Sequence, residues 1–179
     1  ISTMLKSFIC LGVVSLLWVV VAFSMSFGSP IGPTINGTHY GIIGNPFEFA
    51  FFSHVAMNPH SSMASSIPFI LFALFQMKFA VITPAIITGA LAERIRFISF
   101  LLFICLFTLC IYAPLCHMIW HPNGLLGSYF GVKDFAGGTV VHMSAGWAAL
   151  AGALYLRRRK SHIESNILPP ANIPYVLLG

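Results

Sequence analysis

The sequence predicts an all-α integral membrane protein, built as a transmembrane helix bundle. Of its 179 residues, 58% are hydrophobic and only 7% are charged, whereas an ordinary soluble domain is about 25% charged. Four apolar stretches are long enough to cross a hydrocarbon core, which takes about 20 residues of helix. The positive residues gather at the ends of these stretches, which is typical of cytoplasmic loops.

The predicted spans follow one another along the chain. They cover approximately residues 5–27, 64–91, 97–120 and 135–156. Pro84 falls inside the second span, where we expect a kink, and Pro114 falls near the end of the third. A last apolar stretch, 173–179, is too short to cross the membrane and predicts the start of a further helix.

The charges of the loops predict the side of the membrane on which each loop lies. The turn at 92–97 contains two arginines, and the segment 157–172 opens with the run Arg-Arg-Arg-Lys. The positive-inside rule therefore places both in the cytoplasm. Loops 28–63 and 121–133 then lie on the extracellular or periplasmic side, so successive loops alternate, as consecutive spans require.

Composition also argues against several other functions. The net charge of +5 does not indicate nucleic-acid binding, because the positive residues cluster beside apolar segments. The four cysteines lie in apolar segments without C-x-x-C spacing, which favours packing over disulfides or metal binding. We expect no cofactor, no metal and no enzymatic activity.

The fourth span contains a histidine, His142, deep among small and apolar residues. A helix rises 1.5 Å per residue, so His142 lies roughly 12 Å below Asp134, close to the midplane of the membrane. An ionisable group at that depth is costly and marks a pathway for an ion, a proton or a polar substrate. We therefore interpret His142 as a pore-lining residue rather than a packing residue. A neutral imidazole can donate and accept hydrogen bonds, so it can act as a relay.

Asp134 stands where the fourth span begins. A carboxylate at this position can accept hydrogen bonds from free backbone N–H groups and is stabilised by the helix dipole. The alternative role is a cation-binding carboxylate. The position favours the helix cap.

For three aromatic residues and one lysine, the sequence allows more than one role. Phe75 and Phe79 are four residues apart and share a helix face, either for packing or as an aromatic gate over a pore. Trp120 ends the third span, where it could belong to the interfacial belt or bind a small cation. Lys78, near the middle of the second span, must snorkel, pair or face a polar interior.

Together these features resemble the ammonium transporter family (Amt/Mep/Rh), and its Amt branch in particular. The resemblance rests on four segments in the family's order: Phe75–Phe79, Gly89–Phe97, Tyr112–Trp120 and Asp134–His142. It implies an inverted-repeat fold of about eleven spans, of which 1–179 would be a partial domain with spans two to five and the start of span six. It also implies a homotrimer, and in some members a PII-type regulatory protein on the cytoplasmic side.

The resemblance assigns roles to particular residues. Trp120 and Phe75 would recruit ammonium at the outer vestibule, with Asp134 as a buried acid near that site. Phe79 would be one of two stacked gate residues, and His142 the first of two pore histidines. The expected function is transport of ammonium or ammonia across the cell membrane, by cation recruitment, deprotonation and conduction past the histidine.

The sequence leaves two rival hypotheses open. The chain could be an ammonium sensor or a non-conducting fragment, in which the same cation site binds without transport. A more distant alternative is a b-haem electron carrier, because histidines on membrane helices can ligate haem iron. His142 has no second midplane histidine in the sequence, which counts against haem.

Overall fold

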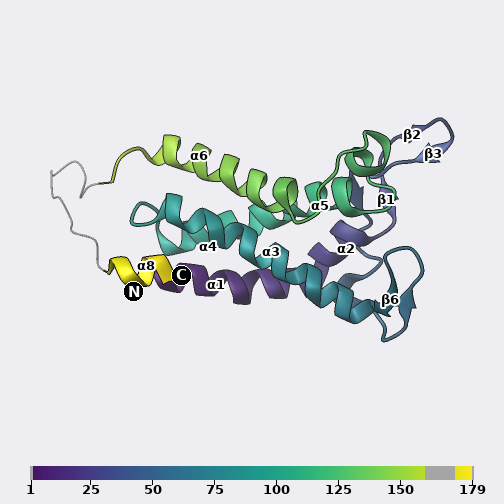
Figure 1. Cartoon of the computed structure of the whole chain (residues 1–179), viewed down its shortest axis with the longest axis horizontal. Helices are drawn as coiled ribbons and strands as arrows, with labels where there is room; N and C mark the ends of the chain where they lie inside the picture. Colours follow the sequence, from purple (N-terminus) through teal and green to yellow (C-terminus); the bar gives the residue numbers. More distant parts are fainter. Residues whose placement is uncertain (1, 160–171, 179) are drawn as a thin grey trace.

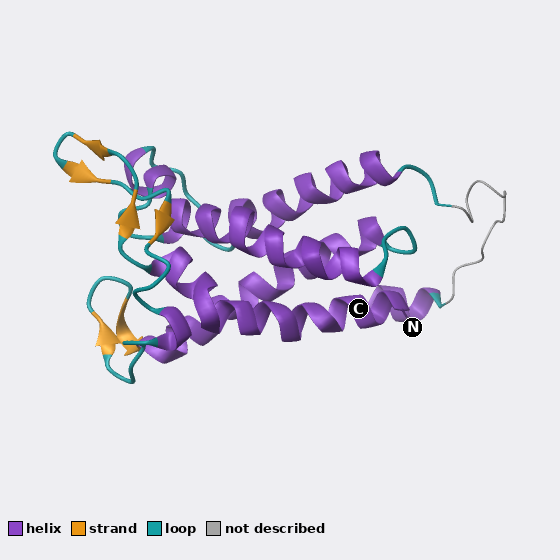
Figure 2. Cartoon of the chain, turned by 180° about the vertical axis from the view of Figure 1, so that it is seen from behind, coloured by secondary structure: helices purple, strands orange, loops and turns teal. Residues whose placement is uncertain are grey.

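The computed structural model describes residues 2–159 and 172–178 as a bundle of helices with short strands at one end (Figures 1 and 2). Within these residues, four helical stretches are long and apolar enough to cross a membrane: Met4–Phe27, Phe69–Leu91, Phe97–Trp120 and Gly138–Leu156. The predicted fold class, an all-α multi-pass membrane protein, is therefore confirmed.

The first span joins α1 (Ser2–Leu17), a π-helical turn η1 (Trp18–Ala22) and α2 (Phe23–Phe27). Its buried residues Cys10, Val14 and Trp18 are spaced by four, so they form one face, and α1 packs against α3 and α4. The indole nitrogen of Trp18 donates to the backbone oxygen of Ala73 at 3.0 Å, which joins the first two spans at the centre of the core.

The predicted loop 28–63 is folded over one end of the bundle rather than extended. Its strands β1 (Pro30–Ile31) and β4 (Ile43–Gly44) pair, as do β2 (Thr34–Ile35) and β3 (Thr38–His39), followed by the turn η2 (Ala50–Phe52). Asn36 and Gly37 connect β2 to β3 with φ values of 51° and 80°, the left-handed conformation that a tight hairpin requires. Phe49 then packs against Phe23, with ring centroids 5.7 Å apart.

The second span is shorter than the predicted 64–91. The strands β5 (Pro59–His60) and β6 (Ala64–Pro68) pair, so the helix α3 (Phe69–Leu91) begins only after Pro68, whose ψ of 136° is extended. Apolar content alone did not reveal this pairing. The helix α3 continues through Pro84.

The third span has the predicted bounds, 97–120. It consists of α4 (Phe97–Phe107), the π-helical turn η3 (Thr108–Tyr112) and α5 (Ala113–Trp120). The wide turn lies just before Pro114, whose ring would clash with the carbonyl four residues earlier in a regular α-helix. A further π-helical turn, η4 (Leu125–Tyr129), follows in the connection to the fourth span.

The fourth span joins η5 (Gly138–Met143) to α6 (Ser144–Leu156), so it begins three residues later than the predicted 135. The intervening backbone turns around the side chain of Asp134, as described below. The helix α6 packs against α3 through small residues: a Cβ added to Gly152 would lie 2.8 Å from Leu91. The short helix α8 (Ile173–Leu178) begins where a further span was predicted, whereas residues 160–171 of the predicted cytoplasmic loop lie outside the described residues.

The turn between α3 and α4 and the end of α6 lie at the end of the bundle opposite to the strands (Figure 1). Lys6 is buried there and donates to the backbone oxygen of Ile95 at 2.9 Å, which ties α1 to this turn. Arg159 donates to the backbone oxygen of Gly89 at 3.0 Å. Lys6 and Arg159 are thus attached to the bundle through backbone carbonyls.

Candidate functional site

Three of the predicted aromatic residues form a continuous contact. Phe75 and Phe79 lie one turn apart on α3, with ring centroids 5.0 Å apart and planes at 82°. Phe79 also contacts Trp120, the last residue of α5, at 5.7 Å and 67°. Edge-to-face contacts of this kind are favourable between aromatic rings. They bring the second and third spans together at this point.

Asp134 caps the fourth span with both of its carboxylate oxygens. Oδ1 accepts from the backbone N–H groups of Gly137 at 2.6 Å and Gly138 at 3.0 Å. Oδ2 accepts from those of Thr139 at 2.8 Å and Val140 at 2.9 Å. These are the N–H groups that a helix start leaves unpaired, and the negative charge is stabilised by the helix dipole. The structural role that the sequence favoured is therefore present.

Gly137 makes this cap possible. Its φ of +83° is left-handed, a conformation that glycine adopts without steric cost. A Cβ at this position would also lie 2.9 Å from the Cγ2 atom of Val141. The backbone therefore turns tightly around the Asp134 carboxylate only because residue 137 is glycine.

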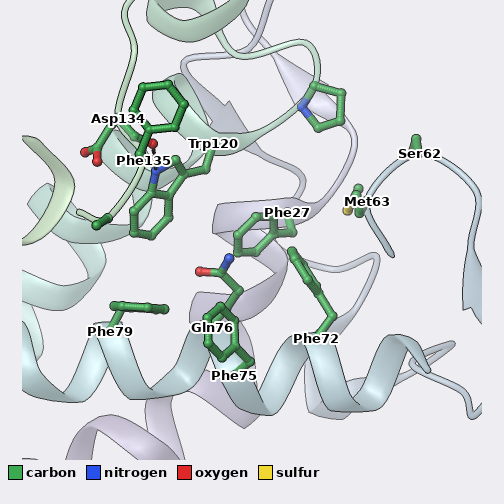
Figure 3. Close-up of a pocket in the computed structure, with 12 residues that line it drawn as sticks. Phe27, Ser62, Met63, Phe72, Phe75, Gln76, Phe79, Trp120, Asp134 and Phe135 are labelled. Carbon is green, nitrogen blue, oxygen red and sulfur yellow. Dashed lines mark hydrogen bonds between the residues drawn. The ribbon is translucent and has the colours of Figure 1, made fainter. Parts of the chain in front are cut away.

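The predicted aromatic and acidic residues line one cavity of about 280 Å³ (Figure 3). Phe75, Phe79, Trp120 and Asp134 all contribute to its wall. The cavity opens among α3, the end of α5 and the residues before η5, at the end of the bundle where the strands lie. A site with ring faces and a carboxylate around it suits a small cation.

The cavity has further lining residues that the sequence interpretation missed. Phe27 comes from the end of the first span, Phe72 and Gln76 from α3, and Ser62 and Met63 from the loop before β6. Gln76 offered a signal in the sequence, because it is the one amide in a mostly apolar span. Nothing in the local sequence indicated Phe27 or the loop residues, since folding alone brings them to the cavity.

His142 lies in η5, one turn after the first helical residue Gly138, and does not line this cavity. The predicted depth of roughly 12 Å requires a helix that starts at Asp134, so His142 lies less deep in the span than predicted. Its side chain is exposed on the surface of the described chain. Lys78 is also exposed and lies outside the cavity wall. The structure thus assembles four of the five predicted site residues and leaves the histidine deeper along the same span.

Among the histidines that the structure describes, His117 is the other one within a span. It is fully buried, its Nδ1 atom lies 3.0 Å from the backbone oxygen of Ser26, and its ring stacks on His121 at 4.4 Å. The backbone of Gly41 lies so close to Nε2 that a side chain there would collide with it. Both ring nitrogens are enclosed by protein, so His117 offers no position for a haem iron.

His121 lies just past the end of the third span, beside Trp120. Burial lowers the pKa of its imidazole to about 4, while Glu48 raises this pKa and His60 lowers it. Its Nδ1 atom accepts from the backbone N–H of Asn123 at 3.0 Å, which requires the nitrogen to be unprotonated. His121 is therefore neutral near pH 7 and adds no positive charge next to Trp120, although it does not line the cavity itself.

Comparison with known proteins gives a consistent result. The family model described as the Ammonium Transporter Family matches residues 1–179. The chain is 40% identical over 178 residues to an ammonium transporter of Bacillus subtilis, covering 99% of this chain and 40% of that protein. It is 39% identical over 168 residues to ammonium transporter 1 of Dictyostelium discoideum, covering 93% of this chain and 34% of that protein.

A solved structure shares the fold. Mep2 of Saccharomyces cerevisiae superimposes with a TM-score of 0.77 at 31% identity, over 98% of this chain and 37% of that one. The chain thus spans between about a third and two fifths of the length of the relatives that it matches.

Proposed function

The chain belongs to the ammonium transporter family, and from that premise we propose that the whole protein moves ammonium or ammonia across a membrane. The observation that carries the proposal is the cavity where Phe75, Phe79 and Trp120 meet beside Asp134. Its wall combines aromatic faces with a carboxylate, which together favour a small cation over a neutral or anionic solute.

Recruitment is the first step. The exposed face of Phe75 and the indole of Trp120 attract ammonium at the mouth, by about 0.5–2 kcal/mol for each well-placed ring. Asp134 contributes its negative charge and holds the local backbone, because its oxygens are occupied by four backbone N–H groups. The neutral state of His121 preserves this attraction near pH 7.

Selection and conduction follow. Phe79 is the gate, since its ring lies between those of Phe75 and Trp120 and forms an apolar barrier to hydrated ions. A bare ammonium ion pays a large desolvation cost in a dry pore, so the neutral form is favoured beyond the gate. His142, one turn into the fourth span, supplies hydrogen-bond partners for ammonia and a relay for the released proton.

The protein's orientation follows from charge. In the proposed arrangement, loops 92–97 and 157–172 face the cytoplasm and loops 28–63 and 121–133 face the outside of the cell membrane. The placement of the α3–α4 turn and the strands at opposite ends of the bundle supports this alternation. By family resemblance we propose a homotrimer, with a PII-type regulatory protein docking on the cytoplasmic side.

Proteoliposomes test the transport proposal. The whole protein is reconstituted, and ammonium flux and methylammonium uptake are compared with those of protein-free liposomes. Faster flux that saturates with ammonium concentration supports the proposal. Saturable ammonium binding without any flux would instead identify a sensor, and a Soret band in the purified protein would point to haem.

A further inference from the structure

The cavity contains a polar side chain that the proposed mechanism does not use. Gln76 is the one amide in α3, a helix that the structure describes in full, and only 9% of its surface is exposed. Its Oε1 atom is buried and has no hydrogen-bond partner among the described residues. An unpaired buried carbonyl oxygen is costly and uncommon in proteins, so its presence in a binding cavity points to a ligand.

The position of the amide fits such a ligand. Figure 3 shows the Gln76 side chain reaching into the cavity between Phe79, Trp120 and Phe27. Its oxygen is on the side of Phe79 and Trp120, and its nitrogen is on the side of Phe27. The free acceptor therefore faces the same space as the aromatic rings that attract a cation.

The other side-chain acceptors of this wall are already engaged. Each carboxylate oxygen of Asp134 accepts two backbone N–H groups, which uses the hydrogen-bonding capacity of the carboxylate. The carboxylate also points away from Gln76 in Figure 3. The Ser62 hydroxyl pairs with Nδ1 of His60 at 3.3 Å. Ser62 is also exposed, so among the described cavity residues Gln76 is the side chain with a buried acceptor that has no partner.

We propose that the Gln76 carbonyl accepts an N–H hydrogen bond from ammonium bound in this cavity and gives the site its preference for N–H-bearing cations. Ring faces and a nearby carboxylate attract any small cation, so they do not distinguish ammonium from a cation that cannot donate. The inference rests on the proposed function, because it names a binding residue at the same site.

Equilibrium binding to the purified whole protein in nanodiscs tests this role. Ammonium chloride and tetramethylammonium chloride are titrated at constant ionic strength, and binding is followed by the fluorescence of Trp120 with a Trp120→Phe protein as the blank. The test variants are Gln76→Met, which removes the acceptor at similar volume, and Gln76→Glu, which keeps it. Met77→Leu is the matched control, because Met77 is the next residue of α3 and lies outside the cavity wall.

We expect Gln76→Met to weaken ammonium binding about tenfold or more, the usual effect of losing a hydrogen bond to a charged group, and to leave tetramethylammonium binding unchanged. Gln76→Glu retains tight ammonium binding, and Met77→Leu binds both cations as wild type does. Equal weakening for both cations would show a packing role, and unchanged ammonium binding by Gln76→Met would also overturn the inference. A wild-type protein that binds ammonium selectively through Gln76 but does not transport it would refute the proposed function alone.

Discussion

The indole nitrogen of Trp120 donates to the backbone oxygen of Asp134 at 3.2 Å. This bond joins the last residue of the third span to the residue that caps the fourth. The Trp120 ring, which faces the cavity, is therefore fixed to the same residue whose carboxylate caps the fourth span. A change in the cap is expected to disturb the aromatic wall as well as the helix.

Replacing Asp134 tests the structural role of the cap. Asp134→Ala leaves the N–H groups of residues 137–140 without their acceptor, so we expect the free energy of unfolding to fall by about 2 kcal/mol or more. Asp134→Asn keeps one acceptor oxygen and is expected to lose less. Thermal unfolding in nanodiscs measures both. Equal stability of wild type and Asp134→Ala would contradict the assigned cap.

Replacing Trp120 tests cation recruitment. Trp120→Leu removes the ring face from the cavity, and we expect the ammonium concentration for half-maximal transport to rise between about twofold and thirtyfold, the equivalent of 0.5–2 kcal/mol. Trp120→Phe is expected to fall between this variant and wild type. The matched control is Trp147→Leu, because Trp147 is exposed on α6 away from the cavity. Similar effects from Trp120→Leu and Trp147→Leu would argue against recruitment.

Replacing Phe79 tests the gate. Phe79→Ala removes the ring that contacts both Phe75 and Trp120, so hydrated ions are expected to enter and a potassium leak to appear in proteoliposomes. Leu74→Ala, an exposed position of α3 outside the cavity, serves as the control. A Phe79→Ala protein that stays impermeable to potassium would show that this residue is not the barrier.

The pH dependence of stability tests the burial of His121. Burial lowers its pKa in the folded protein to about 4, below the ordinary value of 6.5, so the unfolded chain binds the additional proton first. Its contribution is therefore fully present above pH 6.5 and is lost as pH falls toward 4. We expect His121→Asn, whose side-chain oxygen can still accept from Asn123, to reduce the loss of thermal stability over this window. Identical pH profiles for the variant and wild type would contradict the assignment.

Local sequence predicted the parts of the fold that depend on local rules. Apolar length predicted the spans, the residue type of Asp134 at a span start predicted the cap, and a spacing of four predicted the shared face of Phe75 and Phe79. Each of these needs only neighbours within a few turns of the chain. The structure has all three features.

What the sequence did not predict depends on residues far apart. The start of α3 at Phe69 follows from pairing between β5 and β6, which apolar content does not reveal. Phe27 and Gln76 are 49 positions apart and reach one cavity only through the packing of their spans. The sequence does not assign Gln76 to the site, because a single amide carries no spacing pattern of its own.

The proposed conduction pathway past His142 is tested most directly by ammonium flux through the whole protein in proteoliposomes. The flux is compared between wild type, His142→Ala and His142→Asp. An imidazole within a membrane span that relays protons cannot be replaced by a methyl group, so His142→Ala is expected to abolish the flux. His142→Asp is expected to abolish it or to convert it into ammonium-ion current. Unchanged methylammonium uptake and unchanged ammonium current in both variants would contradict the pathway proposed past this residue.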